Sequence, residues 1–258
     1  MAPEDSGVFR MFDLKDRVAI VTGASSGLGE HVAKVLAAAG ARVAVVARRS
    51  ELLVPLAKEI DGLPVAFDLL DVQELGGLVA RVAEGLGSPE ILVNAAGSIF
   101  GDEPAEREPL GTIEKTLTLN LVAPFRLCQA VHPHMLAASR GSIINISSIS
   151  GHIGVPSIPQ ASYAASKLGL SGLTRDLAAQ WAADSIRVNT IAPGYFRSEI
   201  TEPLYESERG DAWLRRNTPL PYHGSVEDFG GAVLWLASDA GRYVTGQTII
   251  IDGGWTVR

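Results

Sequence analysis

Short apolar segments alternate with helix-forming segments along almost the whole chain, and this alternation constrains the fold more than any other feature. The first apolar run, at residues 17–22, is short and continuous, as is expected of a strand that is buried on both faces. The expected strands cover residues 17–22, 43–46, 64–67, 90–93, 142–146, 186–191 and 248–251. The expected helices cover residues 30–39, 50–60, 71–84, 110–138, 161–183 and 225–237. The pattern predicts an α/β fold, with a doubly wound parallel sheet of seven strands flanked by helices.

The length of 258 residues and the hydrophobic content of 47% predict a single domain over residues 1–258. The net charge is −7 and the basic residues are scattered, so no nucleic-acid surface is expected. No apolar run approaches the length of a membrane span, and residues 1–16 lack the features of a signal peptide. The lone Cys128 is interpreted as a buried structural thiol. These features favour a soluble, cytoplasmic protein without membrane partners.

The alternation breaks once, between residues 194 and 224. This segment contains Pro203, Pro219 and Pro221 together with several charges and aromatic side chains. Long irregular insertions in compact domains are usually functional. We therefore interpret residues 194–224 as an irregular insertion that contributes to a substrate site.

Three glycines, Gly23, Gly27 and Gly29, lie at the first strand-to-helix turn. Glycine lets the backbone approach a pyrophosphate closely, and the following helix N-terminus favours negative charge. A purely structural turn is the alternative. The position of the turn, at the start of an alternating α/β chain, favours a phosphate-binding loop.

The end of the second strand is where such folds select their dinucleotide. An acidic residue there binds the ribose hydroxyls of NAD, and an arginine accommodates the extra phosphate of NADP. This chain has Ala47, Arg48 and Arg49 and no acid, which favours NADP(H) over NAD(H). Asp68, at the end of the third strand, is placed to accept a hydrogen bond from the adenine amine.

Tyr163 and Lys167 are four residues apart in an expected helix, so both lie on one face. A lysine beside a phenol favours the phenolate and lowers the pKa of the phenol, which suits it to acid/base catalysis near neutral pH. A chance pairing is the alternative, and a lone Tyr-x-x-x-Lys match is weak.

Taken together, the motifs resemble the short-chain dehydrogenase/reductase family over nearly the whole chain, from about Leu14 to Gly254. The branch is the one with the TGxxxGxG, NAAG and YxxxK motifs, and the chain is most similar to bacterial ketoreductases and gluconate 5-dehydrogenase-like members. The markers are Thr22-Gly-Ala-Ser-Ser-Gly-Leu-Gly29, Asp68, Asn94-Ala-Ala-Gly97, Asn120, Ser147-Ser148, Tyr163-x-x-x-Lys167, Pro193-Gly194 and Asp252-Gly-Gly254. The resemblance implies a Rossmann-like fold.

The resemblance also implies catalytic roles. Tyr163 is expected to be the acid/base, Lys167 to lower its pKa, and Ser148 to orient the substrate oxygen. Ser147 and Ser150 remain alternatives for the serine role. The connection from Ser148 to Tyr163 is two residues longer than is common in the family, with the extra residues within 155–159. A fourth catalytic residue, Asn120, is expected to bind a water that links Lys167 to solvent.

The cofactor residues that the resemblance implies lie after several strands. They are Gly23, Ser25, Ser26, Gly27, Leu28, Gly29, Arg48, Arg49, Asp68, Leu69, Asn94, Ala95, Ala96, Gly97, Tyr163, Lys167, Pro193, Gly194, Phe196 and Ser198. Asn94 is expected mainly to steady the sheet.

The expected substrate pocket is largely apolar, which is typical of a small-molecule site. Its candidates are Ser150, His152, Ile153, Tyr195 and Trp213, with Ile99, Phe100 and Phe196 beside them. The five histidines form no evident ligand set, so no metal site is expected.

The favoured function is reversible hydride transfer between NADP(H) and the carbonyl or secondary alcohol of a free small molecule. The alternative is a 3-oxoacyl-[acyl-carrier-protein] reductase, which would need basic residues near the site; here Arg140 and Asp184 stand at the positions concerned. A non-catalytic dinucleotide-binding regulator is the remote alternative. A homotetramer is expected on family grounds, with residues 110–138, 161–183 and the tail 253–258 as contact segments.

Overall fold

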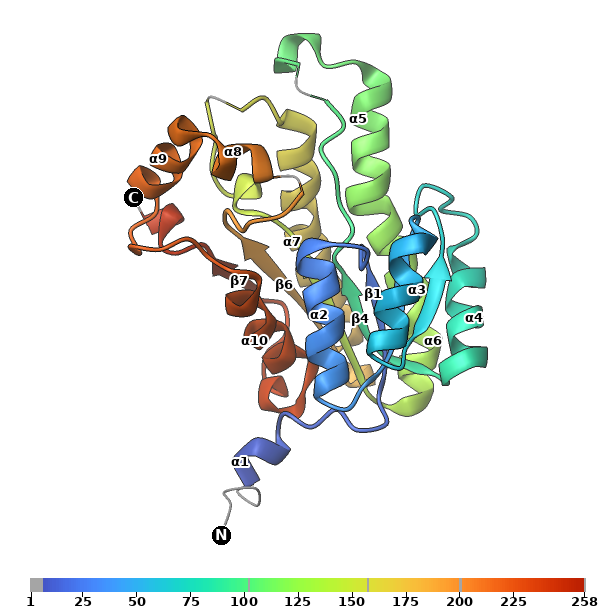
Figure 1. Cartoon of the computed structure of the whole chain (residues 1–258). Coiled ribbons are helices and arrows are strands. Elements are labelled where there is room, and N and C mark those ends of the chain that lie inside the picture. Colours follow the sequence, from blue (N-terminus) through green and yellow to red (C-terminus); the bar gives the residue numbers. More distant parts are fainter. Residues whose placement is uncertain (1–6, 102, 157, 200, 258) are drawn as a thin grey trace.

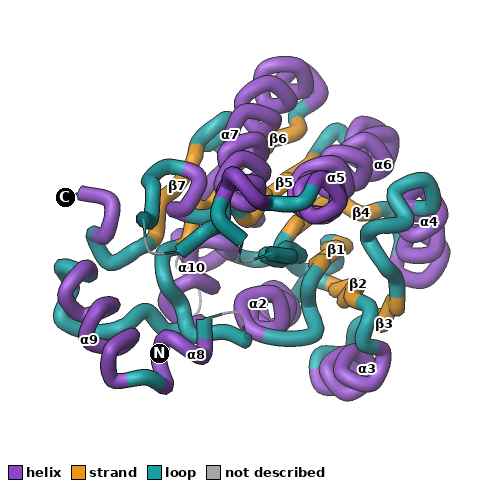
Figure 2. The backbone as a smooth tube through the Cα atoms, turned by 90° about the horizontal axis from the view of Figure 1, so that it is seen from above, coloured by secondary structure: helices purple, strands orange, loops and turns teal. Residues whose placement is uncertain are grey.

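The computed structural model describes residues 7–101, 103–156, 158–199 and 201–257. What the sequence predicts for residues 1–6, Ser157, Ile200 and Arg258 lies outside the described residues. Seven parallel strands form one sheet in the order β3-β2-β1-β4-β5-β6-β7 (Figure 1 and Figure 2). The strands are β1 Val18–Thr22, β2 Arg42–Ala47, β3 Leu63–Ala66, β4 Pro89–Asn94, β5 Gly141–Ile146, β6 Ile186–Pro193 and β7 Thr248–Ile251. The predicted single-domain α/β fold is confirmed.

Helices cover both faces of this sheet, as Figure 2 shows from above. The helices are α1 Gly7–Arg10, α2 Gly27–Ala38, α3 Ser50–Glu59, α4 Leu75–Leu86, α5 Leu110–Leu117, α6 Ala123–Ala138, α7 Ala161–Trp181, α8 Glu202–Glu206, α9 Glu208–Asn217 and α10 Val226–Ala237. One apolar core packs α2, α3 and α10 against one face of the sheet, and a second packs α4, α6 and α7 against the other. Every residue of β1 and of β5 is buried, because both faces are covered.

The helix expected over residues 110–138 is interrupted by a wide π-helical turn, Thr118–Val122, between α5 and α6. Its signature is the backbone N–H of Ala123, which bonds the carbonyl of Thr118 five residues earlier. A proline ring clashes with the carbonyl four residues before it, and Pro124 would meet Asn120 in this way. The wide turn resolves that conflict, and it places Asn120 within the irregularity.

Two other expectations need correction. The helix expected over residues 71–84 begins only at Leu75, because residues 68–74 form turns in which the carboxylate of Asp68 accepts the N–H of Leu70 at 3.0 Å. The insertion is not irregular throughout. It contains α8 and α9, and Ser207 starts α9 by accepting the N–H of Gly210 at 3.0 Å. Within the described ranges, no helix combines the length and the apolar character that crossing a bilayer requires.

Candidate active site

The sheet reverses its winding between β1 and β4, because β2 and β3 lie on one side of β1 and the later strands lie on the other. In open parallel sheets, ligands bind at this switch point beyond the carboxyl ends of the strands. Thr22, the last residue of β1, holds the two sides together. Its hydroxyl oxygen accepts the backbone N–H groups of Ala95 and Ala96, each at 3.1 Å.

The glycine turn after β1 is shaped by close backbone contacts. Gly23 has a φ of +67°, and a Cβ built there would lie 2.8 Å from the Cα of Ala96. A Cβ on Gly29 would collide with the carbonyl oxygen of Gly23. The turn leads directly into α2, whose N-terminus faces the same crevice. This narrow turn at a helix N-terminus fits the pyrophosphate of a dinucleotide.

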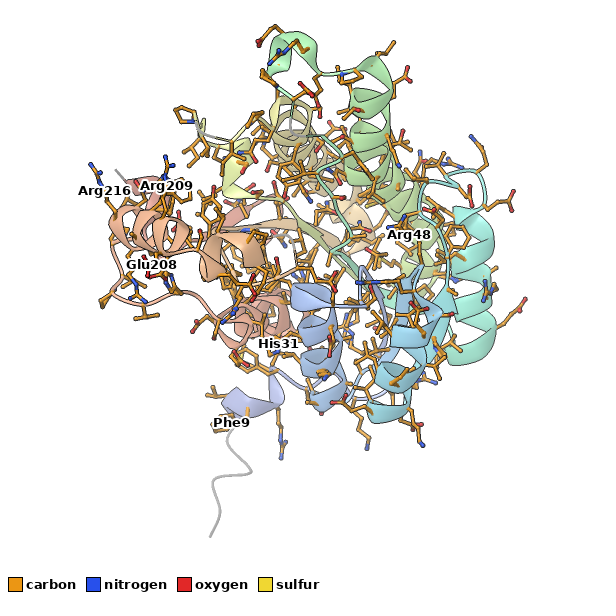
Figure 3. The ribbon with its side chains drawn as sticks, turned by 45° about the horizontal axis from the view of Figure 1, so that its top comes forward. Phe9, His31, Arg48, Glu208, Arg209 and Arg216 are labelled. Carbon is orange, nitrogen blue, oxygen red and sulfur yellow. The ribbon has the colours of Figure 1, made fainter. Side chains whose placement is uncertain are left out.

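The two arginines after β2 differ in their surroundings. Arg48 is exposed, and Figure 3 shows it near the start of α3, far from the Arg209 and Arg216 of α9. Arg49 is half-buried and turns toward the glycine loop, where its Nη2 donates to the hydroxyl of Ser25 at 2.9 Å. Asp68 lines the same cleft, and one of its carboxylate oxygens already accepts the N–H of Leu70.

Tyr163 and Lys167 lie one turn apart near the start of α7, with the ammonium nitrogen 5.6 Å from the centroid of the phenol ring. Burial raises the pKa of the Tyr163 phenol, and a hydrogen bond with Ser148 opposes that rise. Burial also lowers the pKa of Lys167 to about 8. Burial therefore outweighs the hydrogen bond with Ser148 in setting the direction of the shift in the Tyr163 pKa. The effect of Lys167 on the pKa of the phenol, which the sequence predicts, stays a prediction.

The three candidate serines occupy different environments. Ser147 is buried and its hydroxyl donates to the carbonyl of Lys167 at 2.6 Å, so it anchors α7. Ser148 is half-buried, and its oxygen accepts the N–H of Ser150 at 3.1 Å. All three line the cleft, and Ser148 is the one that hydrogen-bonds Tyr163. This contact favours Ser148 over its two neighbours as the partner of the phenol.

Asn120 lies behind the cleft and is completely buried in the π-helical turn. Its amide oxygen accepts the N–H of Ser98, and its amide nitrogen donates to the carbonyl of Ser98 and to the hydroxyl of Ser166, at 3.0–3.1 Å. A Cβ built on Gly97 would lie 2.9 Å from the Lys167 nitrogen and 3.3 Å from the Asn120 oxygen. Asn120 therefore holds the loop after β4 against α7, next to Lys167.

These groups open into one cleft of about 680 Å³ at the carboxyl end of the sheet. Its lining includes Tyr163, Lys167, Ser148 and every predicted cofactor residue except Asn94. Asn94 is buried, and its side-chain amide nitrogen donates to the amide oxygen of Asn145 at 2.9 Å. Of the predicted substrate residues, Ser150 and Tyr195 line the cleft, as do Ile99, Phe100 and Phe196. Among the described residues, His152, Ile153 and Trp213 are not part of the lining.

The position of Trp213 is explained by an aromatic cluster on the insertion. Its ring lies behind Tyr195 at a centroid distance of 5.3 Å, and Trp255 contacts both rings at 4.7–4.8 Å. The C-terminal end of the chain therefore lies beside α9 (Figure 1). Trp213 and Trp255 support Tyr195 from behind, and His152 is exposed.

Several lining residues were not predicted from the sequence. They are Ala47, Phe67, Leu70, Ser98, Leu119, Ile146, Ile149, Ile158, Gln160, Glu199, Thr201 and Leu204. Ile158 and Gln160 belong to the longer connection between Ser148 and Tyr163, and that extra length was the signal available for them. Leu204 comes from α8, whose position depends on the tertiary fold.

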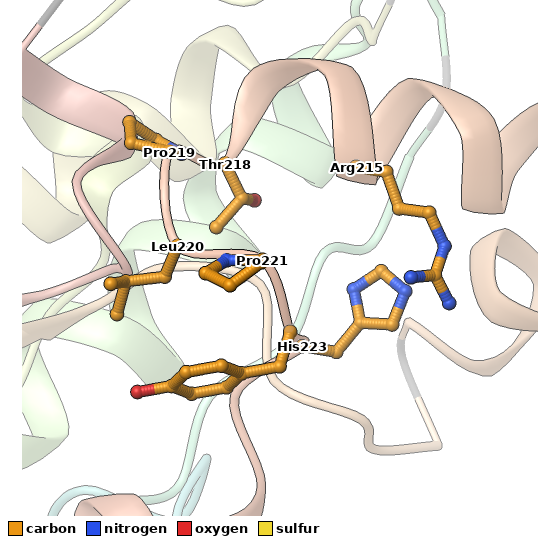
Figure 4. Close-up of a pocket in the computed structure, with 7 residues that line it drawn as sticks. Arg215, Thr218, Pro219, Leu220, Pro221 and His223 are labelled. Carbon is orange, nitrogen blue, oxygen red and sulfur yellow. The ribbon is translucent and has the colours of Figure 1, made fainter.

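A smaller hollow of about 200 Å³ lies on the insertion after α9 (Figure 4). It is formed mainly by residues 218–223, and Arg215 and His223 lie at one end of it. None of the predicted catalytic or cofactor residues contributes to it. Within the described part of the chain, no cluster of three or more His, Cys, Asp or Glu side chains is arranged to hold a metal ion.

The chain is similar to known proteins over nearly its whole length. A family model described as "Enoyl-(Acyl carrier protein) reductase" matches residues 23–256. The chain is 35% identical to the D-threitol dehydrogenase of Mycolicibacterium smegmatis, covering 96% of this chain and 95% of that protein. Its structure is similar to a short-chain type dehydrogenase/reductase from Mycobacterium marinum, with a TM-score of 0.92, 35% identity and coverage of 98% and 100%. It is also similar to a gluconate 5-dehydrogenase from Burkholderia cenocepacia in complex with NADP and tartrate, with a TM-score of 0.91, 33% identity and coverage of 97% and 99%.

Proposed function

The chain belongs to the short-chain dehydrogenase/reductase family, and on that premise we propose that it is an NADP(H)-dependent oxidoreductase with Tyr163 as its acid/base. The observation that carries this proposal is the position of the Tyr163 phenol. It contacts Ser148 and opens into the same cleft as the phosphate-binding turn after β1. A proton-transfer group and a dinucleotide cradle therefore share one cavity.

The proposed roles of the side chains follow from their contacts. NADP(H), when bound, supplies or accepts the hydride. Tyr163 gives its proton to a carbonyl oxygen in reduction and takes one from an alcohol in oxidation. The hydroxyl of Ser148 orients that oxygen and stabilises the phenolate. Lys167, with its pKa lowered to about 8 by burial, carries a positive charge at neutral pH that favours the phenolate electrostatically.

The preference for NADP(H) is supported by the basic end of β2. Arg48 and Arg49 both line the cleft, and Ser25 and Ser26 provide hydroxyls beside Arg49. Arginine binds a phosphate through two parallel N–H bonds, which suits it to the extra phosphate. The NADP complex of the similar gluconate 5-dehydrogenase agrees with this choice of cofactor.

We propose a free small ketone or secondary alcohol as the substrate. The part of the cleft near Tyr163 is lined by Ile99, Phe100, Ile158, Tyr195 and Leu204. Gln160 and Ser150 supply polar groups there, so an uncharged carbonyl or polyol suits the lining.

A carrier-protein reductase is less favoured, although the matching family model carries such a description. Docking an acidic carrier requires available basic side chains near the site. Arg140, the residue that the sequence offered, is paired with Asp239 at 2.6 Å and lies 3.9 Å from Glu90. Its charge is already neutralised within the chain.

We also propose a homotetramer. Leu110 on α5, Phe125 on α6 and Leu168 on α7 are large apolar side chains that are 68%, 39% and 49% exposed. A second copy could cover them. The tail was expected to form another contact, but Trp255 packs inside the chain against Tyr195 and Trp213. Light scattering at micromolar concentration tests this assembly, and a monomer would contradict it.

A panel of ketones and polyols, assayed with NADPH and NADH and in the reverse direction with NADP⁺ and NAD⁺, tests the proposed function. We expect turnover of at least one uncharged substrate with a higher kcat/KM for the phosphorylated cofactor. Tight cofactor binding without turnover of any substrate would instead favour the regulator. Turnover confined to acyl-carrier thioesters would favour the carrier-protein reductase.

A further inference from the structure

The guanidinium of Arg49 connects three segments that are distant in sequence. Its Nη1 and Nη2 donate to the two carboxylate oxygens of Glu199, each at 3.0 Å. Its Nη2 also donates to the hydroxyl oxygens of Ser25 at 2.9 Å and Ser26 at 3.0 Å. One side chain after β2 thus holds the phosphate-binding turn after β1 and the insertion after β6.

The insertion approaches the phosphate-binding turn at this point. A Cβ built on Gly27 would lie 3.4 Å from the Cβ of Ser198. Glu199, Ser198 and Arg49 all line the main cleft. The Glu199 carboxylate is charged, because hydrogen bonds from Arg49 and Ser26 hold its pKa below the ordinary value. A negative charge from the protein itself therefore lies at the cofactor end of the cleft.

The arrangement of donors around Glu199 is one that also suits a phosphate. An arginine fork binds carboxylate and phosphate through the same pair of parallel N–H bonds, so it serves one of them at a time. We propose that Glu199 competes with the 2′-phosphate of NADP(H) for Arg49 and is a determinant of cofactor preference. This inference rests on the proposed use of NADP(H). NAD(H) lacks the phosphate and does not require Glu199 to leave Arg49.

The exposure of the pair indicates that Glu199 tunes binding without preventing it. The side chains of Arg49 and Glu199 are 41% and 59% exposed. Exposed ion pairs contribute little stability, so a dianionic phosphate can displace this carboxylate. Arg48 has no partner within the described residues and is available as a second contact for the phosphate.

The test is to measure binding of two nucleotide fragments, 2′,5′-ADP and 5′-AMP, to the full chain by isothermal titration calorimetry. Glu199→Gln keeps the size of the side chain and removes its charge. We expect the Kd of 2′,5′-ADP to fall about two- to fivefold, the range that an exposed ion pair represents. The Kd of 5′-AMP should stay the same.

Glu202→Gln is the matched control. It removes the ion pair of Glu202 with Arg197 at 2.6 Å in the same insertion, and should change neither Kd. An unchanged Kd of 2′,5′-ADP in Glu199→Gln would overturn the inference. So would a rise in the Kd of 5′-AMP, because Glu199 would then hold the ribose. The assay involves no turnover, so a failed substrate panel and a failed competition are separate results.

Discussion

The ammonium of Lys167 lies 5.6 Å from the centroid of the Tyr163 ring, and the hydrogen bond that it donates goes to the main-chain carbonyl of Ile146 at 2.9 Å. Lys167 thus ties the start of α7 to the end of β5. The positive charge of the ammonium acts on the phenol electrostatically over that distance. The direct contact of the phenol is with Ser148, on the loop that follows the same strand.

Removing the Tyr163 hydroxyl tests the proposed acid/base. In Tyr163→Phe we expect kcat for ketone reduction to fall by at least about 100-fold, because positioned proton transfer contributes that much or more. The Kd of NADPH, measured by fluorescence titration, should change little. A variant that keeps the wild-type kcat would show that another group transfers the proton.

Lys167→Met tests the cost of burying the ammonium. Burial lowers the pKa of Lys167 from 10.5 to about 8, so between these values the unfolded chain binds more protons than the folded one. The free energy of unfolding of the wild type should therefore rise with pH relative to the variant, by at most about 1.4 kcal/mol per pH unit. As pH falls toward 8, that stability is lost. Urea unfolding at several pH values between 7 and 10 measures the difference, and a difference independent of pH would contradict this prediction.

Thr22→Val tests the connection across the switch point. The substitution removes the oxygen that accepts the N–H groups of Ala95 and Ala96. Ala95 keeps a bond to the carbonyl of Val93 at 3.1 Å, so Ala96 loses its acceptor. Ala96 is only partly buried and lines the cleft, so we expect the free energy of unfolding to fall by about 0.5–1.5 kcal/mol, the net contribution of a hydrogen bond. Denaturant unfolding measures this change.

Thr116→Val is the matched control for that substitution. Thr116 is also buried, and its hydroxyl has no hydrogen-bond partner within the described structure. Replacing it by an apolar group should be neutral or stabilising. If both variants lost the same stability, the contacts of Thr22 would not be the cause.

Glu108→Gln tests how the helix that carries Tyr163 is anchored. One Glu108 oxygen accepts the hydroxyl of Ser162 and the other accepts the N–H of Ser162 at 3.4 Å, at the start of α7. Negative charge is favourable there, so we expect a loss of about 1 kcal/mol in the free energy of unfolding. Thermal unfolding compares it with Glu106→Gln, an exposed neighbour. Equal melting temperatures would show that Glu108 does not stabilise α7.

Much of the fold follows from local chemistry. The apolar run at residues 18–21 forms a strand because a sheet covered on both faces buries both sides of each strand. Gly23 and Gly29 mark the first turn because a Cβ at either position would collide with backbone. The helical spacing of Tyr163 and Lys167 places them on one face whatever surrounds them.

Other features depend on packing between distant segments. The π-helical turn at Asn120 is needed only where Pro124 continues a helix that must stay against the sheet. Trp213 lies behind Tyr195, outside the described lining of the cleft, because Trp255 from the end of the chain packs against both rings. No sequence spacing predicts these contacts.

The sequence by itself determined the layered α/β fold, the glycine turn after β1 and the helical spacing of Tyr163 and Lys167, because each depends on local periodicity or on glycine geometry. Only the tertiary structure decided the charge environment of those residues. It buried Tyr163 and Lys167, and it brought Glu199 to Arg49 across 150 positions of sequence. Desolvation and ion pairing act over a few ångströms in space, so these properties emerge only once the chain has folded.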